Sequence, residues 1–367
     1  MPLGVLFNKK TEKQIKKEEW KSMGRGNPKY HKTLHQQAYD KLQSLTAYGQ
    51  SKHEAKKTGV DKEKIYSYST YKTYKQWVFA FTKWEKENHP EVTTLKKAKR
   101  HVGDYLQSLV DNGSYSASTI ATATAALNKI YQMAPNDPQR FTPPERHRAD
   151  ITRSRNAVEY DRHFSEANNR ELVNFAQATG ARRAALEKLT GADLYTVEQL
   201  HGYIDKMRDL VEQGQTLTKT QVIRLNLIND TLKTFPNESH FVYFDRDKGG
   251  RCRYAPIIGE HKQDVIDRFN NTGRGEKVWL AVPKAMDVHS YRSDYATALY
   301  RAYARPIDTI PYDKTNKGSG QKYQSGVYHC RGDLKGVSLD KAAMQQVSKA
   351  LGHNRLEVVA SHYLRGI

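Results

Sequence analysis

Apolar residues between positions 61 and 140 recur at the spacing of amphipathic helices. One stripe at i, i+3, i+4 and i+7 predicts a buried helix face, and His89-Pro90 predicts the end of that helix, because helical geometry is disfavoured before proline. A second stripe predicts a helix that Asn112-Gly113 closes in a left-handed turn, and SASTIATATA opens a third helix. We therefore expect a compact helical unit. The stripes consist of Tyr74, Trp77, Val78, Phe81 and Trp84, then Val102, Tyr105, Leu106 and Leu109, then Ile120, Leu127 and Ile130.

The segments on either side of this unit have a different pattern. Residues 1–60 are rich in lysine, and apolar residues at helical spacing predict one short helix over 34–47. The earlier run KKTEKQIKKEEWK fits either a solvated charged helix or an arm that follows DNA. Residues 141–159 contain two prolines near their start, followed by basic residues, which predicts a linker.

Residues 160–367 predict helices with one small antiparallel sheet. The runs HFVYF (240–244) and CRYAPII (252–258) alternate like strands, and the glycines of DRDKGGR between them indicate a hairpin turn. Residues 196–235 predict two helices around GQTLT, whereas 305–338 predict a long exposed excursion. The expected fold class is mainly α with a small antiparallel β-sheet.

The charge of the chain narrows the classes of partner. Its 367 residues carry 60 basic and 40 acidic side chains, a formal net charge of +20 that is spread along the whole sequence. Such a field favours a polyanion, with nucleic acid first and an anionic membrane surface second. No basic amphipathic helix with a large apolar face and no run of membrane-spanning length is evident, so we expect no membrane partner. Cys252 and Cys330 are expected to be reduced thiols in a cytoplasmic protein.

Four separated motifs carry the chemistry. They are TGARRAALEKLTGADL (179–194), Lys248 in the predicted hairpin turn, HSYRSDYAT (289–297), and LGH (351–353) followed by Tyr363. In this order they resemble the tyrosine recombinase (phage-type integrase) family. In that family an arginine follows a Thr-Gly turn, a lysine sits in a β-hairpin, His-x-x-Arg opens a helix, and Leu-Gly-His precedes a nucleophilic tyrosine.

The resemblance implies an architecture and a reaction. Residues 160–367 would form the catalytic domain, and residues 61–140 would form the helical, SAM-like core-binding domain, the two making a C-shaped clamp on double-stranded DNA. A homodimer would occupy one site and a homotetramer would form in synapsis. Strands would be cut and rejoined through a 3′-phosphotyrosyl intermediate, without metal, cofactor or ATP.

The resemblance also assigns roles to two arginines and the tyrosine. Arg182 and Arg292 would bind the scissile phosphate, because a guanidinium offers phosphate a planar fork of donors and stays charged. Arg183 is the alternative to Arg182. Tyr363 would be the nucleophile, and a phenol with an ordinary pKa near 10 needs neighbouring cations or a base for that role.

Three further residues would move protons. Lys248 would be the general acid that protonates the departing 5′ oxygen, with Arg251 as the local rival for phosphate contact. His289 and His353 would bind the phosphate and assist proton transfer, since imidazole donates or accepts near neutral pH. Asp287 is expected to cap the helix that carries His289 and Arg292.

The sequence departs from the family pattern at several places. Ala185 stands where the family often has an acidic residue, and the interval from His353 to Tyr363 is one residue longer than the commonest spacing. We interpret 196–235 and 305–338 as insertions that contact DNA or a neighbouring protomer. Only four residues follow Tyr363, so either an insertion replaces the usual docking helix or the sequence is truncated.

Two other functions fit the same residues. One is a DNA-binding protein of this fold that does not cleave, although such a protein has no need of Tyr363. The other is a topoisomerase or hairpin-end resolvase that uses the same chemistry. The leading hypothesis is a site-specific recombinase that performs integration or excision.

Overall fold

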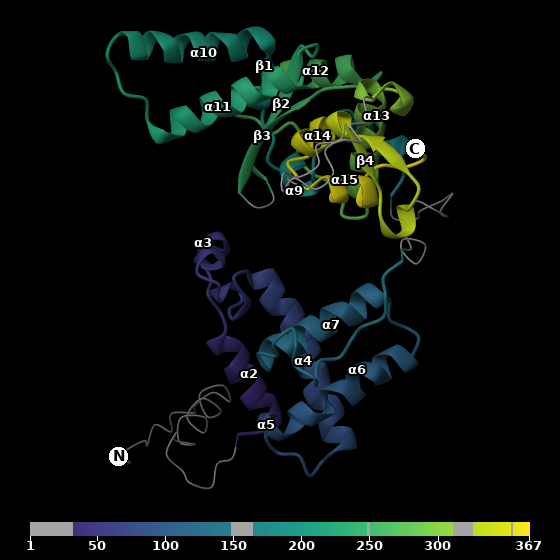
Figure 1. The fold of residues 1–367 in the computed structure, drawn as a ribbon. Helices are drawn as coiled ribbons and strands as arrows, with labels where there is room; N and C mark the ends of the chain where they lie inside the picture. The colour runs from purple at the N-terminus through teal and green to yellow at the C-terminus, as the bar shows by residue number, and fades with distance from the viewer. Residues whose placement is uncertain (1–31, 148–163, 248–249, 311–325, 354) are drawn as a thin grey trace, which may run out of the picture. The chain divides into compact units, whose positions relative to one another are not determined.

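The computed structural model describes residues 32–147, 164–247, 250–310, 326–353 and 355–367. The chain divides into two compact units, Met1–Asp150 and Ile151–Ile367, and each is described by itself (Figure 1). Among the described residues, no helix is both long enough and apolar enough to cross a membrane.

The first unit is helical. Its described elements are α2 (Leu34–Ser44), α3 (Lys52–Lys57), η1 (Val60–Lys62), α4 (Tyr68–Asn88), α5 (Leu95–Ala98), η2 (Lys99–His101), α6 (Val102–Asp111) and α7 (Ala117–Ile130).

The predicted stripes of the first unit pack into one core. Phe81 of α4, Leu106 of α6 and Leu127 of α7 are fully buried in the same cluster. The predicted helix ends are confirmed, because α4 ends at Asn88 with His89 as its C-cap, and Gly113 after α6 has a φ of +68°. The predicted helices over 34–47 and from the SASTIATATA segment are confirmed as α2 and α7.

Polar caps fix where the helices of this unit begin. The hydroxyls of Ser67, Thr94 and Ser116 accept from backbone N–H groups in the first turns of α4, α5 and α7. Each such cap stabilises its helix by about 1 kcal/mol, because the first N–H groups of a helix have no partner within it.

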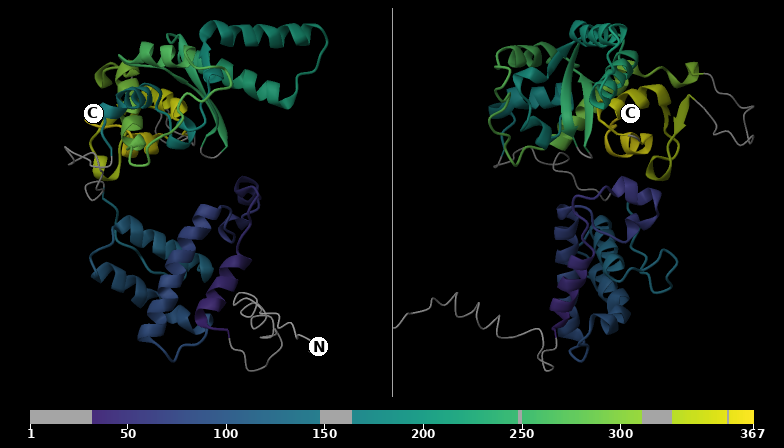
Figure 2. Two further views of the ribbon diagram at one scale, coloured as in Figure 1. Left: turned by 180° about the vertical axis from the view of Figure 1, so that it is seen from behind. Right: turned by 90° about the vertical axis from the view of Figure 1, so that its left-hand side faces the viewer.

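The second unit combines helices with two small antiparallel sheets (Figure 2). Its helices are η4 (Ala167–Asn169), α8 (Arg170–Thr179), α9 (Arg183–Leu186), η5 (Gly191–Asp193), α10 (Val197–Glu212), α11 (Lys219–Thr234), α12 (Lys262–Asn270), α13 (Val288–Tyr303), η6 (Ile307–Thr309), η7 (Gly332–Leu334), α14 (Lys341–Ala350) and α15 (Leu356–His362). Its strands are β1 (Leu194–Thr196), β2 (His240–Asp247), β3 (Arg251–Pro256), β4 (Val327–His329) and β5 (Ser338–Asp340).

The larger sheet, in the order β1-β2-β3, is buried on both faces. Val242 and Ala255 pack into a cluster with apolar residues of α8 and α12. Phe241 and Tyr254 pack into a second cluster with residues of α11, α13, α14 and α15. Because α13 contributes Tyr291 to the first cluster and buried residues to the second, it spans the core between the two.

The sheets differ from the expectation in one respect. The hairpin of β2 and β3 is confirmed, but a second sheet, β4-β5, lies where the sequence predicted an exposed excursion. Ile310, Val327 and Cys330 are buried in this region, whereas more than half of its other described residues are exposed, so a few apolar side chains anchor an otherwise exposed segment. Each strand has three residues, too few for an alternating pattern to be recognised. Residues 311–325 of the excursion lie outside the described residues, as does most of the predicted linker at 141–159.

The two helices predicted within 196–235 are confirmed as α10 and α11, which run side by side as a helical hairpin (Figure 1). Each begins with a capping box, Thr196 with Gln199 and Thr218 with Gln221. Among the described residues, Cys252 and Cys330 are not in a disulfide, and Cys330 packs in the core.

Candidate active site

The Thr-Gly turn places Arg182 at the start of a short helix. Gly180 ends α8 with a φ of +59°, and a Cβ at this position would lie 2.4 Å from the ring of Tyr295, so no larger residue fits. Arg182 then adopts extended geometry as the N-cap of α9. Its side chain is only 12% exposed. The guanidinium donates to the carboxylate of Asp247 and, at 3.3 Å, to the carbonyl of Leu351.

Arg292 lies in the second turn of α13. The side chain of Asp287 accepts from the backbone N–H of Ser290 at 3.1 Å, which confirms the predicted cap of this helix. Arg292 is fully buried and donates to the carbonyls of Gly180 and Leu351. Arg182 and Arg292, which are 110 positions apart in the sequence, therefore meet at one oxygen atom of the Leu-Gly-His motif.

His353 and Tyr363 lie beside these arginines. The Nε2 atom of His353 is 3.1 Å from the hydroxyl of Tyr363. The guanidinium carbon of Arg292 lies 5.5 Å from the centre of the Tyr363 ring, and Tyr363 is 8% exposed. His353 is fixed through its backbone, because its N–H donates to the carbonyl of Ser348 at 2.7 Å and its carbonyl accepts from the Ser348 hydroxyl at 2.9 Å.

The other two residues predicted to be catalytic are His289 and Lys248. His289 is exposed in the first turn of α13, three residues before Arg292 and so on the same side of the helix. Lys248 lies outside the described residues, between the ends of β2 and β3. The structure thus brings together Arg182, Arg292 and the His353–Tyr363 pair.

Arg183 and Arg251, the two alternatives for phosphate contact that were named from the sequence, lie in different surroundings. The guanidinium of Arg183 is surrounded by main-chain carbonyls of the segment before α13, including Val282 at 3.2 Å and Met286 at 2.6 Å. Through these hydrogen bonds Arg183 holds the segment before α13, which is a structural role. Arg251 is exposed at the start of β3.

Two residues of the site were missed by the sequence analysis, Asp247 and Arg253. The carboxylate of Asp247 accepts from both Arg182 and Arg253, and its side chain is 6% exposed. Arg253 is buried, donates through Nε to the carbonyl of Ala350 at 2.7 Å, and lies over the ring of Phe244. The available signal was one charge inside the apolar run CRYAPII, since a buried strand holds an arginine only when that arginine has partners.

The three guanidinium groups make a strongly positive site. Burial lowers the pKa of Arg253 and of Arg292, and repulsion from neighbouring arginines lowers both further. Asp247 opposes this effect at both arginines, and Tyr363 opposes it at Arg292. Three positive charges against the one carboxylate that bonds to them leave a surplus of two.

The site also contains buried N–H groups that could donate hydrogen bonds to a ligand. Within the described part of the chain, Nη2 of Arg253 and Nε of Arg292 are buried without a hydrogen-bond partner. A buried guanidinium with an unsatisfied N–H is costly unless an acceptor is supplied. The arrangement is therefore suited to binding an anion with several acceptor oxygens, next to a phenol and an imidazole.

Replacing Asp247 with asparagine tests this anion site without an activity assay. We expect the Asp247→Asn variant to lose about 3 kcal/mol of unfolding free energy, because two buried arginines lose their charged partner. Added sulfate is expected to stabilise the variant more than the parent chain, as an anion takes over the role of the carboxylate. Urea denaturation at several sulfate concentrations measures both effects. Asp245→Asn, at an exposed position of the same strand, is the matched control, and equal sulfate responses of all three proteins would contradict the anion site.

The comparisons with known proteins bear on the first unit. No curated protein matches the chain. Residues 61–140 match the family model described as the phage integrase N-terminal SAM-like domain. This match covers α4, α5, α6 and α7, and it confirms the resemblance drawn from the apolar stripes of this region. Residues 61–140 are therefore similar to the N-terminal SAM-like domain of phage integrases.

Proposed function

We propose that this protein is a site-specific DNA recombinase that cleaves and rejoins duplex DNA through a 3′-phosphotyrosyl intermediate. The observation that carries the proposal is the convergence of Arg182 and Arg292 on Leu351 beside the paired side chains of His353 and Tyr363. A SAM-like integrase domain in the same chain supports it independently.

The proposed reaction begins with binding of the scissile phosphate at the arginines. The unpartnered donors of Arg292 and Arg253, together with the outer N–H groups of Arg182, would bind its non-bridging oxygens. Negative charge builds up on these oxygens in the transition state, where preorganised donors in a water-poor site are most effective. Metal is not needed for this stabilisation, because the guanidinium groups already provide a surplus of positive charge.

The proposed chemical step exchanges one phosphate ester for another. The oxygen of Tyr363 forms a bond to phosphorus while the bond from phosphorus to the 5′ oxygen breaks. The phenolic proton passes to Nε2 of His353, which already lies within hydrogen-bond distance of the hydroxyl. Lys248 would give its proton to the departing 5′ oxygen, and His289 would contact the phosphate. Reversal by another 5′ hydroxyl rejoins the strand without an energy source.

Asp247 connects the β2–β3 hairpin to the arginines of the proposed active site. Its carboxylate ties the end of β2 to Arg182 and Arg253. Since Lys248 is the next residue in the chain, this bond would anchor the general acid near the scissile phosphate. Asp247 is thus a positioning residue in the proposal, and it stands in a chain that has alanine at position 185.

The proposal includes a DNA complex of defined composition. The SAM-like domain and the +20 charge support binding to double-stranded DNA. Because binding to phosphates releases counterions, the affinity should fall steeply as salt rises. A homodimer on inverted half-sites, a homotetramer in synapsis and a C-shaped clamp around the duplex belong to the proposal.

A supercoiled plasmid without a selected site separates the proposal from its alternatives. The recombinase is expected to bind this plasmid in a salt-sensitive way and to relax it poorly, while forming a covalent adduct on duplexes selected by binding. Efficient relaxation of the plasmid would favour a topoisomerase instead. Tight binding to selected duplexes without any adduct, even when the duplexes are nicked, would favour a DNA-binding protein that does not cleave.

A further inference from the structure

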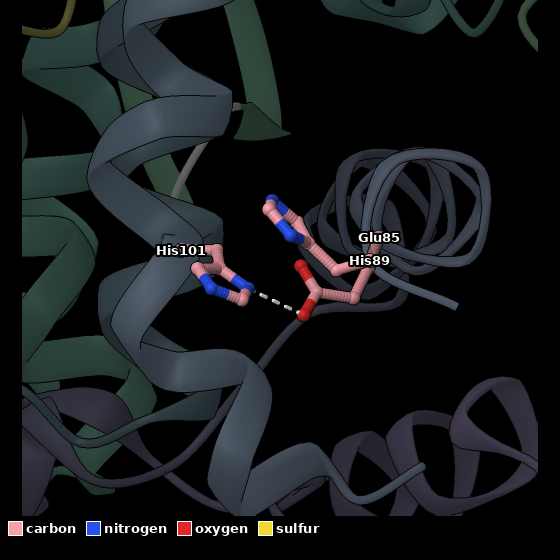
Figure 3. A group of neighbouring side chains, drawn as sticks. All are labelled: Glu85, His89 and His101. Carbon is pink, nitrogen blue, oxygen red and sulfur yellow. Dashed lines mark hydrogen bonds and ion pairs between the residues drawn. The ribbon is translucent and has the colours of Figure 1, made fainter. Parts of the chain in front are cut away.

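Three potential metal ligands meet in the first unit, whereas the proposed active site residues all belong to the second unit. Glu85 lies in the last turn of α4, His89 is the C-cap of this helix, and His101 ends η2. One ligand atom from each side chain lies within 4.8 Å of the others. Figure 3 shows the Glu85 carboxylate beside the two imidazole rings, with Glu85 and His89 on one helix and His101 on the facing segment.

The carboxylate of Glu85 has an unusual environment for a glutamate. It falls on the apolar stripe of α4, four residues after Phe81, and is fully buried. Its Oε1 is 2.7 Å from Nδ1 of His101. Its Oε2 is buried and has no hydrogen-bond partner among the described residues. A buried carboxylate oxygen without a donor is costly, and a cation would satisfy it.

The two histidines are arranged so that they can turn toward that oxygen. Their rings stack with centroids 3.7 Å apart, and the side chain of His89 is 30% exposed. His89 has a weak charged neighbour in Glu91, 4.0 Å from its Nδ1. Arg100 donates to Nε2 of His101 at 3.0 Å, so the proton of this ring is on Nδ1, where it faces Glu85.

We propose that Glu85, His89 and His101 bind a divalent transition metal, with Zn²⁺ as the ion that best fits two imidazoles and one carboxylate. Three such ligands and one water complete the tetrahedral geometry that Zn²⁺ adopts. Ligand atoms around Zn²⁺ are about 3.4 Å apart at the usual bond lengths. The two imidazole rings must therefore rotate from their stacked positions to bring their nitrogen atoms and the carboxylate oxygen to this separation.

Metal binding has a defined proton balance. Coordination through Nδ1 of His101 requires the proton on that atom to leave, either to solvent or to Nε2 with Arg100 turning away. Arg100 is exposed and has Glu91 3.9 Å from its guanidinium as a nearby partner. The bound ion would join the end of α4 to the start of α6, so it would stabilise the SAM-like domain rather than take part in strand cleavage.

The test measures metal binding by the full chain. After removal of metal with a chelator, the protein is titrated with Zn²⁺ and, separately, with Co²⁺, whose visible absorption reports tetrahedral coordination. We expect one site per chain whose affinity falls ~10-fold or more in each of Glu85→Gln, His89→Gln and His101→Gln. Zn²⁺ is also expected to raise the melting temperature of the parent chain and not that of the three variants. His53→Ala, at an exposed position of α3, is the matched control and should bind as the parent does.

The His89→Gln variant distinguishes a metal site from a buried ion pair formed by Glu85 and His101 alone. Glu85 and His101 already bond to each other, whereas His89 contacts this pair through ring stacking. Loss of metal binding in His89→Gln, with secondary structure retained by circular dichroism, supports the site. The proposal is overturned if the parent chain shows no tetrahedral Co²⁺ absorption. It is also overturned if the Zn²⁺ affinity of His89→Gln equals that of the parent.

Discussion

Replacing Tyr363 with phenylalanine is expected to abolish the covalent adduct with DNA and leave DNA binding unchanged. The variant lacks only the hydroxyl that lies 3.1 Å from Nε2 of His353. The ring keeps its position beside Arg292 and in the apolar cluster of α13, α14 and α15. Nicked duplexes that trap the adduct, analysed on a denaturing gel, measure the loss, and a mobility-shift assay on the same duplexes measures binding.

A matched tyrosine serves as the control for this experiment. Tyr303 also lies in the second unit, is partly buried, and donates its hydroxyl to Glu238 at 2.9 Å. Tyr303→Phe removes one hydroxyl at a comparable depth and should form the adduct at the parental level. An adduct that persists in Tyr363→Phe and disappears in Tyr303→Phe would contradict the assignment of the nucleophile.

Replacing Arg182 with alanine is expected to lower the rate of strand cleavage by about 10²–10³-fold or more, because a positioned donor to the transition-state charge is lost. The fold should persist, since Asp247 keeps Arg253 as its partner and the surplus of positive charge decreases. We expect the unfolding free energy to change by about 2 kcal/mol or less. Single-turnover cleavage and urea denaturation measure the two effects separately.

Two further variants define what Arg182 contributes. Arg182→Lys keeps the charge but loses the planar fork, so its cleavage rate should lie between those of the parent and the alanine variant. Arg274→Ala removes an exposed arginine that follows α12 and lies outside both proposed insertions, and this variant should cleave normally. A collapse of thermal stability in Arg182→Ala would show that this arginine supports the fold rather than the chemistry.

The helices and the grouping of Arg182, Arg292 and His353 could be predicted from the sequence, because each has a local sequence signal. The stripe of α6 repeats at helical spacing, and a proline or glycine marks where α4 and α6 end. Arg182, Arg292 and His353 stand in short motifs whose turns are local as well. Gly180, two residues before Arg182, and Gly352, directly before His353, both take positive φ angles.

The place of Asp247 in the site could not be predicted in this way, because it depends on an irregularity in the β2–β3 hairpin. The register of β2 and β3 shifts between Phe244 and Asp247, and Arg246 between them has a φ of +44°. Such a bulge redirects the side chains that follow it, so alternation along the strand does not predict where Asp247 points. Glu85 could not be predicted for another reason, because one glutamate next to an apolar stripe does not by itself show whether its carboxylate is buried or solvated.

The second sheet was missed because neither of its strands carries a pattern of its own. β4 and β5 have three residues each and are held by pairing with each other. Val327 of β4 and Leu339 of β5 are buried, and Leu339 packs into the cluster that contains residues of α13 and α14, but one or two apolar residues in such short strands show no recognisable period. Tertiary packing, rather than local preference, decides the structure of such short segments.

The most direct measurement is to identify the residue that becomes attached to DNA. Duplexes selected from a random pool by binding to the full chain are nicked near their centre and incubated with the protein, and the trapped adduct is digested and sequenced by mass spectrometry. The proposed mechanism predicts a nucleotide linked through its 3′ phosphate to the peptide that contains Tyr363. Attachment to any other residue, or through a 5′ phosphate, would contradict it.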